Sequence, residues 1–339
     1  MQNTTPKISI VFPCYNGEMY LYENLESIKH LSNINEIEVI IVDNNSNDSS
    51  KQIIKSFKGI NLILIEKSKN LGFAEACNIG VKNSNGEYVF ITNQDVTFPK
   101  NFFQMTFKVF NELNKNGDII LCPAVVFFNN YINYYGAKIH YLGFSYTPKM
   151  YQKIPRKFST FKTLKASGCS MFLKKDIFIK LNGFDSYLFM YHEDSDFSLK
   201  ALRNKISIYT TNKTLLQHQK IHGLINPITY YYIERNRIIY IYKNIDNIKK
   251  LIPYIIFAEL LLILQSFFIG KFKIRFKIYK FLIKNRNQIK NIRHNAFNSK
   301  TLKVKANQLD SGLDPIILGR ILSKVKIFRY IIKILNYVF

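Results

Sequence analysis

The stretch EYVFITNQD, residues 87–95, decides the fold class of this chain. Strand-forming residues run as far as Thr92 and lead straight into Asn93 and Asp95, whose side chains carry oxygen atoms. Open α/β sheets bind their ligands at the carboxyl ends of their strands. A carboxylate and an amide two residues apart can hold a hard divalent cation, which takes substrate phosphates as further ligands. This interpretation predicts a nucleotide diphosphate ligand, and the alternative is a polar turn that ends a strand.

Strand and helix signals alternate through the first half of the chain. Apolar strands are predicted at residues 8–12, 38–42, 61–65 and 87–92. Helices are predicted between them at residues 21–31, at 53–57 and from Asn70 onward. This order predicts an α/β fold with a mostly parallel sheet and right-handed crossovers. Because the strands are continuously apolar, we expect the sheet to be covered on both faces.

After Asp118 the pattern is less regular. Strands rich in Tyr and Phe are predicted to about residue 151, and a further strand is predicted at 166–173. Asp176 is predicted to cap a short helix that Gly183 ends, and residues 193–196 are predicted to precede another helix.

The totals set limits on the class of protein. The chain has 339 residues, a formal net charge of +25 and 47% hydrophobic residues. This length predicts about two domains, and the composition predicts a large core. The four cysteines are widely spaced without a CxxC pair, which indicates reduced thiols in a cytosolic protein rather than a zinc site or a disulfide framework. Residues 1–7 are polar, so we expect no secretory signal.

The composition changes near Asn244. Residues 246–339 carry 19 Lys and Arg against 4 Asp and Glu, so we divide the chain into a domain of residues 1–245 and a basic, apolar-rich helical region of residues 246–339. Residues 251–270 are long enough to span a bilayer, but Glu259 near the middle would cost ~2.5–3.5 kcal/mol there. Basic amphipathic stretches follow at 271–280 and 316–339. We therefore predict peripheral attachment to the cytoplasmic face of an anionic membrane, and the alternative is a helix buried against the first domain.

The polar segments follow the order of a known family. The segments PCYN from Pro13, VDNNSNDSS from Val42, NLGFAEACNIG from Asn70, TNQD from Thr92 and HEDSD from His192 resemble family 2 glycosyltransferases with the GT-A fold. The later segments GFDSYLFMYHEDSDFSLK and LLQHQKIHG resemble the branch that includes rhamnosyltransferases. The resemblance covers about residues 8–244 and excludes the basic region.

The resemblance implies a UDP- or dTDP-linked sugar donor. The residues expected to bind it are Pro13, Tyr15, Asn16, Asp43, Asn70, Gly72, Asn78 and Asn93. The Asp43 carboxylate follows a strand, where it can accept hydrogen bonds from a base N–H or a ribose hydroxyl. The alternative for Asp43 is an Asx-turn with Asn45 and Ser46. Free N–H groups at the helix start after Asn70 favour phosphate.

The same resemblance implies a metal site and a catalytic base. Asn93-Gln94-Asp95 takes the place of the family's Asp-x-Asp, so Asp95 is the expected main ligand for Mg²⁺ or Mn²⁺. In the resembling branch a His at the place of His218 completes the metal site, and His222 is the alternative.

For the chemistry, the resemblance implies that Asp194 takes the acceptor's proton as the acceptor oxygen attacks the anomeric carbon. Glu193 and Asp196 are expected to position the acceptor or a loop. The alternative is that these acidic residues only stabilise a helix N-terminus. Lys200 stands where the family usually has Arg, so we expect an ion pair without bidentate geometry.

Together these features predict an inverting, metal-dependent enzyme. The chain has no Trp, so it lacks the Gln-x-x-Arg-Trp motif of processive synthases, and we expect the addition of a single sugar. The branch resemblance favours rhamnose, with a glycan or lipid-linked acceptor in cell-surface polysaccharide biosynthesis. One alternative is a catalytically degenerate nucleotide-sugar-binding protein tethered to a membrane. Another is a nucleic-acid-binding protein, which is disfavoured because the basic residues cluster in an apolar-rich tail without a nucleic-acid module.

Overall fold

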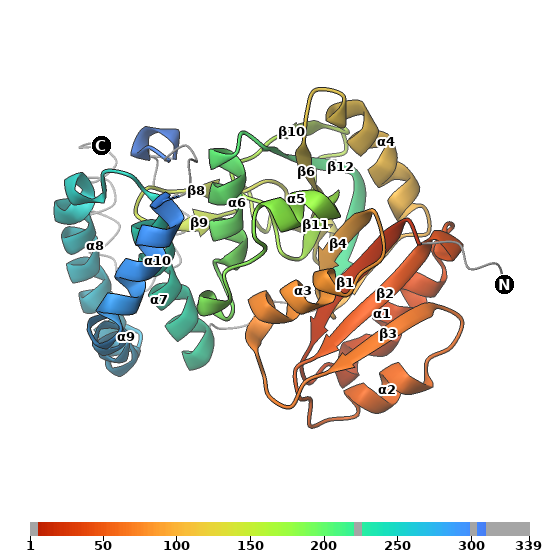
Figure 1. Ribbon diagram of the computed structural model, residues 1–339, viewed down its shortest axis with the longest axis horizontal. Helices are drawn as coiled ribbons and strands as arrows, with labels where there is room; N and C mark the ends of the chain where they lie inside the picture. The colour runs from red at the N-terminus through yellow and green to blue at the C-terminus, as the bar shows by residue number, and fades with distance from the viewer. Residues whose placement is uncertain (1–5, 220–225, 299–303, 310–339) are drawn as a thin grey trace. The chain divides into compact units, whose positions relative to one another are not determined.

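The computed structural model (Figure 1) describes residues 6–219, 226–298 and 304–309. Their contacts group the chain into two compact units: residues 1–137 with 149–223, and residues 138–148 with 224–339. The helix α7, Pro227–Asn244, therefore groups with the second unit. The domain division between residues 245 and 246 stays a prediction, because units defined by contacts do not test where a function ends.

A ten-stranded sheet forms the centre of the first unit, in the order β10-β12-β6-β11-β4-β1-β2-β3, with β5 paired to β12 and β7 to β6. Its strands are β1 Ile8–Cys14, β2 Ile37–Asp43, β3 Asn61–Glu66, β4 Tyr88–Thr92, β5 Val96–Thr97, β6 Ile119–Val126, β7 Ile132–Tyr134, β10 Thr160–Lys162, β11 Ser170–Lys174 and β12 Ser207–His218. The neighbours β3, β2, β1 and β4 are parallel, which confirms the prediction for the first half of the chain. The other half is mixed, because β11 runs antiparallel to both β4 and β6.

Apolar residues form these strands because both faces of the central strands are covered. Every residue of β1, β2 and β6 is buried. The helices of this unit are α1 Glu18–Lys29, α2 Ser50–Ser56, α3 Gly72–Lys82, α4 Phe102–Asn114, α5 Lys175–Lys180 and α6 Glu193–Arg203. α3 contacts β1 and β2, and its Gly80 lies so close to the sheet that a Cβ there would be 2.3 Å from Val11 Cγ1.

Three local predictions are wrong. The strand predicted at 166–173 begins only at Ser170, because residues 167–170 form a tight turn in which the Ser170 N–H donates to the Ser167 carbonyl at 3.0 Å. Asp176 lies inside α5, whose N-cap residue is Lys174. Residues 193–196 form the first turn of α6 instead of preceding it.

The second unit consists of helices and one β-hairpin. Its elements are β8 Lys138–Ile139, β9 Ser145–Tyr146, α7, α8 Ile248–Phe268, α9 Phe272–Lys284 and α10 Arg286–Asn298. The hairpin is bonded to α7: the Tyr240 hydroxyl donates to the Gly143 carbonyl at 2.6 Å, and Arg237 Nη1 donates to the Leu142 carbonyl at 2.9 Å. Gly143 has φ +89, and a Cβ there would lie 2.8 Å from Arg237 Cγ, so the close approach requires glycine.

The stretches 251–270 and 271–280 of the predicted helical region lie largely in α8 and α9, which confirms that they are helical. Among the described residues, α8 is the one helix long and apolar enough to cross a membrane, and 17% of its apolar window is buried. The second amphipathic stretch, residues 316–339, lies outside the described residues.

Candidate functional site

The predicted site residues lie at the carboxyl edge of the parallel strands. Cys14 at the end of β1 is in register with Asp43 at the end of β2, and β4 runs parallel to β1 on its other side. The loops that leave these three strands therefore begin side by side, as Figure 1 shows. This is the edge at which an α/β sheet holds its ligands.

Gln94 joins the loop after β4 to the loop after β1. The Tyr15 N–H donates to Gln94 Oε1 at 3.0 Å, and Gln94 Nε2 donates to the Tyr15 carbonyl at 3.3 Å. A Cβ at Gly17 would lie 2.5 Å from Gln94 Oε1, so only glycine leaves room for this contact. The Tyr15 side chain stays 45% exposed, and Pro13 is buried within β1. Gln94 thus positions the two predicted donor loops, a role that its sequence context did not indicate.

Asp43 forms the turn that was the alternative to ligand binding. It is fully buried, and its two carboxylate oxygens accept the Ser46 N–H at 3.1 and 3.0 Å. Ser46 Oγ in turn accepts the Asn16 N–H at 3.0 Å, and Asn16 Oδ1 accepts the Asn47 N–H at 2.9 Å. A carboxylate has about four acceptor positions, so this turn leaves capacity for a further donor. The nucleoside-binding roles of Asp43 and Asn16 stay predictions.

The start of α3 does not offer the free N–H groups that the sequence suggested. The Gly72 N–H donates to Asn70 Oδ1 at 2.8 Å, and the Ala74 N–H donates to the Phe189 carbonyl at 3.1 Å. Gly72 has φ +82, and a Cβ there would lie 2.3 Å from the Phe189 carbonyl oxygen. Glycine is therefore needed for this close approach, and two of the N–H groups expected to bind phosphate are occupied.

Asn78 ties α3 to the segment before α6. Its Nδ2 donates to the Phe184 carbonyl at 2.9 Å and to Ser186 Oγ at 3.2 Å, and its Oδ1 accepts the Phe184 N–H at 2.8 Å. The amide is thus engaged within the protein. The donor-binding roles expected for Asn70, Gly72 and Asn78 stay predictions that these contacts do not favour.

Asp95 and His218 are brought together by the pairing of β5 with β12. Val96 is in register with His218, and His218 Nε2 lies 3.5 Å from Asp95 Oδ1. The Asp95 side chain is 12% exposed and the His218 side chain is 4% exposed. Asn93 lies partly exposed at the end of β4, two residues before Asp95. His222, the alternative to His218, lies outside the described residues.

This pair fits a divalent cation whose other ligands come from a substrate. Two ligand atoms 3.5 Å apart can contact the same ion. Magnesium-type sites use one or two protein carboxylates, retained waters and substrate phosphates. Within the part of the chain that the structure describes, no group of three His, Cys, Asp or Glu side chains could hold a metal ion. A bound diphosphate would therefore have to complete the coordination.

Asp194 forms a partly buried ion pair with Lys165. Lys165 Nζ lies 2.6 Å from Asp194 Oδ2, and the Gly168 N–H approaches the same oxygen at 3.4 Å. The Lys165 carbonyl accepts the Tyr134 hydroxyl at 2.8 Å, which fixes the backbone at this point. Sequence reasoning missed Lys165, because one Lys among 48 Lys and Arg residues carries no signal until the fold places it against a carboxylate.

Glu193 has the opposite environment. It is buried, and its Oε2 has no hydrogen-bond partner among the described residues. Burial, followed by the charge of Asp194, raises the pKa of Glu193 to about 8. At neutral pH Glu193 is therefore mostly protonated, whereas Asp194 faces a lysine. Such divergence between adjacent carboxyl groups is typical of acid–base sites.

The segment before α6 is held in a strained backbone conformation. Phe189, Tyr191 and His192 have φ values of 66, 66 and 67. Residues with a Cβ adopt this region at a cost of order 1 kcal/mol each, and such residues cluster at functional sites. Asp196 in the first turn of α6 is fully buried, and its Oδ2 lies 3.5 Å from Lys200 Nζ, which confirms the ion pair expected at Lys200.

The turn at residues 167–170 connects the Asp95 side of the site to the Asp194 side. Thr92 Oγ1 donates to the Cys169 carbonyl at 2.8 Å, while the adjacent Gly168 N–H faces Asp194. Burial, followed by the charge of Asp95, raises the pKa of the Cys169 thiol. Asp95 and Asp194 thus both act on this one short turn.

Comparison with known sequences assigns the family. The sequence model described as Glycosyl transferase family 2 matches residues 9–181, a little over half of the chain. The chain belongs to glycosyl transferase family 2. An uncharacterised glycosyltransferase of Rickettsia typhi is 30% identical over 225 residues, which cover 65% of this chain and 66% of that protein. The minor teichoic acid biosynthesis protein GgaB of Bacillus subtilis is 32% identical over 118 residues, which cover 34% of this chain and 13% of GgaB.

The fold of this member of family 2 is also found in solved structures. The crystal structure of GalNAc-T7 with UDP, GalNAc and Mn²⁺ matches with a TM-score of 0.58 at 15% identity, covering 74% of this chain and 50% of that chain. This likeness supports the GT-A-like α/β fold predicted from the sequence. The chain spans just under two thirds of the length of the first curated relatives that it matches. Membership of the rhamnosyltransferase-like branch stays a prediction.

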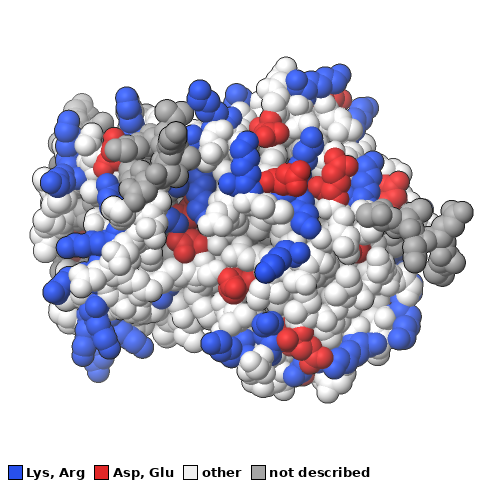
Figure 2. Space-filling model, viewed as in Figure 1, with Lys and Arg blue, Asp and Glu red and all other residues white. Residues whose placement is uncertain are grey.

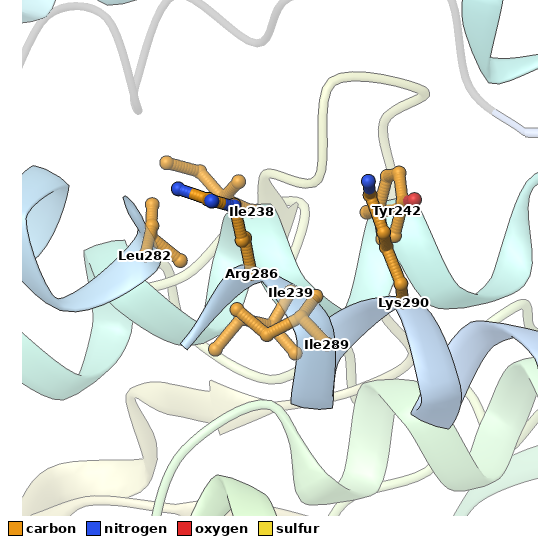
Figure 3. Close-up of a pocket in the computed structure, with 7 residues that line it drawn as sticks. All are labelled: Ile238, Ile239, Tyr242, Leu282, Arg286, Ile289 and Lys290. Atoms are coloured by element: carbon orange, nitrogen blue, oxygen red, sulfur yellow. The ribbon is translucent and has the colours of Figure 1, made fainter. Parts of the chain in front are cut away.

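A separate pocket of about 270 Å³ lies within the second unit, between α7, α9 and α10 (Figure 3). Its lining is mostly isoleucine and leucine, and α10 contributes Arg286 and Lys290. None of the predicted site residues lines it, so it is not the predicted donor site.

Proposed function

We propose that this protein is an inverting glycosyltransferase that moves a single sugar from a UDP- or dTDP-linked donor to a glycan or lipid-linked acceptor in cell-surface polysaccharide biosynthesis. The proposal rests on two adjacent carboxyl groups in opposite environments: Glu193 is buried, with no partner for its Oε2 among the described residues, and Asp194 is paired with Lys165. Both lie beside the turn at residues 167–170, which also accepts a hydrogen bond from Thr92 at the end of β4. Family membership supports sugar transfer, and the likeness to a teichoic acid biosynthesis protein supports a surface polymer as the product. Rhamnose is the proposed sugar, because residues 183–200 resemble the branch of the family that includes rhamnosyltransferases.

Asp194 acts as the base. As the acceptor hydroxyl oxygen attacks the anomeric carbon, its proton passes to an Asp194 carboxylate oxygen and the bond to the nucleotide diphosphate breaks, with inversion at that carbon. Lys165 keeps the Asp194 carboxylate in one orientation before the acceptor arrives. Glu193, protonated at neutral pH, does not compete for the proton and lines the buried side of the site.

Asp95 and His218 would hold Mg²⁺ or Mn²⁺. When bound, the ion neutralises the charge that develops on the leaving diphosphate. Asn93 replaces an acidic residue of the family motif, so the protein contributes one negative charge fewer and the donor diphosphate contributes more to the coordination. Pro13, Tyr15, Asn16 and Asp43 bind the nucleoside, with Gln94 holding the loop of Tyr15 in place.

The second unit attaches the protein peripherally to the anionic cytoplasmic face of a membrane. The support is the excess of basic residues after Asn244 and the exposed lysines of α9. This attachment would bring the protein to a lipid-linked acceptor. The competing possibility is a degenerate, membrane-tethered binding protein, which would bind the nucleotide without turning the donor over.

The test compares the wild-type protein with Asp194→Asn in transfer and donor hydrolysis, with UDP- and dTDP-sugars in Mg²⁺ or Mn²⁺. Loss of a general base typically lowers the rate ~10²–10⁴-fold, so we expect a fall of this size in kcat. Metal-dependent UDP or dTDP binding, followed as a rise in Tm, should persist. The matched control is Asp118→Asn, at a carboxylate that is 46% exposed. Near-normal turnover by Asp194→Asn removes the base assignment, and a wild-type protein that binds the nucleotide without turnover is the degenerate case.

A further inference from the structure

We infer that α8 lies flat in the membrane interface, with one apolar face in the lipid and the face that carries Glu259 against α7 and α9, and that it does not cross the bilayer. This inference rests on the proposed membrane attachment and specifies its geometry and its contact residues. The partner is an anionic lipid surface.

α8 has two distinct faces. Its exposed apolar side chains recur at helical spacing along one side: Ile256, Phe257, Leu260, Leu264, Phe267 and Phe268. Their exposed fractions run from 47% to 67%. Leu251, Leu262, Gln265 and Ser266 are buried on the opposite side, with Glu259. Contiguous apolar surface of this extent on a soluble protein marks an interaction site.

Glu259 is fully engaged on the protein side. Its Oε1 accepts from Arg237 Nη2 of α7, and its Oε2 accepts from Arg275 Nη1 of α9 at 3.0 Å. The Tyr279 hydroxyl also donates to Oε2, at 2.7 Å. The carboxylate that makes residues 251–270 a poor bilayer span is thus neutralised by the helices on which α8 packs.

Glu234 of α7 completes this network. Arg275 Nη2 donates to Glu234 Oε2 at 2.8 Å, and Arg237 Nε donates to the same oxygen at 3.2 Å. Burial alone would raise the pKa of Glu234, but Arg237 and Arg275 outweigh it and hold that pKa below its usual value. Two cations and two anions therefore form a formally neutral, buried cluster.

This cluster argues against a spanning α8. A spanning orientation would place the middle of α8 at the bilayer centre, together with the α7 and α9 side chains bonded to Glu259. A single charged residue at that depth costs ~2.5–3.5 kcal/mol on insertion scales, and mutual pairing offsets only part of this cost for the cluster. α9 would also carry Lys273, Lys277 and Lys280 toward the hydrocarbon. In the flat orientation all of these charges stay on the protein side or in the headgroup region.

α9 supplies the attraction to anionic lipid. Phe272, Phe276 and Ile283 are exposed on it, and the lysines 273, 277, 280 and 284 are exposed beside them. Lys and Arg gather over α9 in Figure 2, at the lower left. An apolar stripe flanked by lysines is the pattern of a helix that lies in the interface. Each such cation near an anionic leaflet contributes ~1 kcal/mol.

The test measures the depth of α8 in the full-length protein bound to vesicles of phosphatidylglycerol and phosphatidylcholine. Single cysteines at positions 256, 260, 264 and 268 carry a nitroxide, in a Cys169→Ser background because the other three native cysteines are buried. Relative accessibility to oxygen and to a nickel chelate reports depth. A flat helix gives four similar depths, ~5–10 Å into the boundary between headgroups and acyl chains. A spanning helix gives depths that differ by up to ~18 Å, since positions 256 and 268 are separated by twelve rises of ~1.5 Å.

The outcomes separate this inference from the proposed membrane attachment. Four similar depths support a flat α8. A graded series of depths overturns it and leaves membrane attachment intact. Vesicle binding without lipid contact at any of the four positions also overturns the inference of a flat α8. In that case α8 is covered by something other than lipid, such as residues 310–339 or a second copy of the chain. Failure to float with vesicles refutes the attachment itself.

A pair of charge variants gives an independent readout. Leu260→Glu places a carboxylate on the exposed face of α8 and should weaken vesicle binding tenfold or more. Met19→Glu makes the same change in net charge on α1, where Met19 is 81% exposed, and should change binding less than twofold. Equal effects of the two variants would contradict the inference, since only net charge would then matter.

Discussion

Lys165 Nζ lies 2.6 Å from Asp194 Oδ2, and each of the two side chains is 14% exposed. At this depth an ion pair is screened less by water than a surface pair, so it orients both groups. Lys165 is therefore a positioning residue for the proposed base, because it holds the Asp194 carboxylate from one side. The pair also predicts how the site responds when the cation is removed.

Lys165→Met should lower kcat at least tenfold while the donor KM stays within about twofold, because the orientation of the base is lost and the donor contacts remain. Lys165→Arg should restore part of the rate. The matched control is Lys55→Met, which breaks the exposed pair with Glu66 and should leave kcat unchanged. A parallel rise in the donor KM, or no rescue by arginine, would show that Lys165 stabilises the folded structure and does not position the base.

Glu193→Gln should stabilise the protein increasingly as the pH rises. The pKa of Glu193 is raised from an ordinary value of 4.5 to about 8, so the folded protein holds a proton that the unfolded chain releases. The folded state of the wild type is therefore penalised progressively between these two pH values, and glutamine removes the penalty. Each pH unit corresponds to ~1.4 kcal/mol at most, so the gain is of the order of a few kcal/mol.

The measurement is the Tm difference between Glu193→Gln and wild type from pH 4.5 to 9. The difference should grow in favour of the variant up to about pH 8 and then level off. Glu36→Gln, an exposed glutamate outside the site, serves as the control. A pH-independent difference would show that Glu193 is charged in the folded protein.

Asp95→Ala and His218→Ala should each abolish the dependence of UDP or dTDP binding on Mg²⁺ or Mn²⁺. Both side chains contribute to the same proposed ion site, so the effects of the single variants should not add in the double variant. The readout is nucleotide affinity by calorimetry, with and without metal. If His218→Ala retains the full metal dependence while Asp95→Ala does not, His218 is a structural partner of Asp95.

Arg275→Met should destabilise the protein by roughly 3–5 kcal/mol, because Glu234 and Glu259 both lose a buried cationic partner. Arg286→Met on α10 removes an exposed arginine and should have little effect. Urea unfolding in the presence of a mild detergent measures both. A small loss for Arg275→Met would mean that water or another cation compensates the two carboxylates.

The sheet edge was predictable because β1, β2, β3 and β4 are short apolar runs, each followed by a polar loop. Periodicity detects such strands, and the parallel order follows from the helices between them. β12 was missed because its threonines and Asn212 interrupt the apolar pattern, although they are buried in the fold. The meeting of Asp95 with His218 depends on the pairing of β5 with β12, which joins residues far apart in sequence.

The individual contacts of the site were beyond sequence reasoning for a related reason. Asn70 and Asn78 have residue types that suit a ligand as well as a turn, and only the fold shows that both are engaged within the protein. Lys165 and Gln94 have no motif around them, and their roles arise from the positions that other strands give to Asp194 and Tyr15. The sequence shows that Glu259 disfavours a bilayer span. It does not show that Arg237 and Arg275 bond to that carboxylate, because this depends on how α7, α8 and α9 pack.

Glu259 gains its two arginine partners at different times during synthesis, because they lie on opposite sides of it in the sequence. Arg237 is already synthesised when α8 emerges, but Arg275 follows Glu259 by 16 positions. At ~5–20 residues per second this is a delay of ~1–3 s, during which a 21-residue apolar helix displays a carboxylate that has only one of its two arginines. The arrival of α9 supplies the second arginine and completes the pairing of this carboxylate.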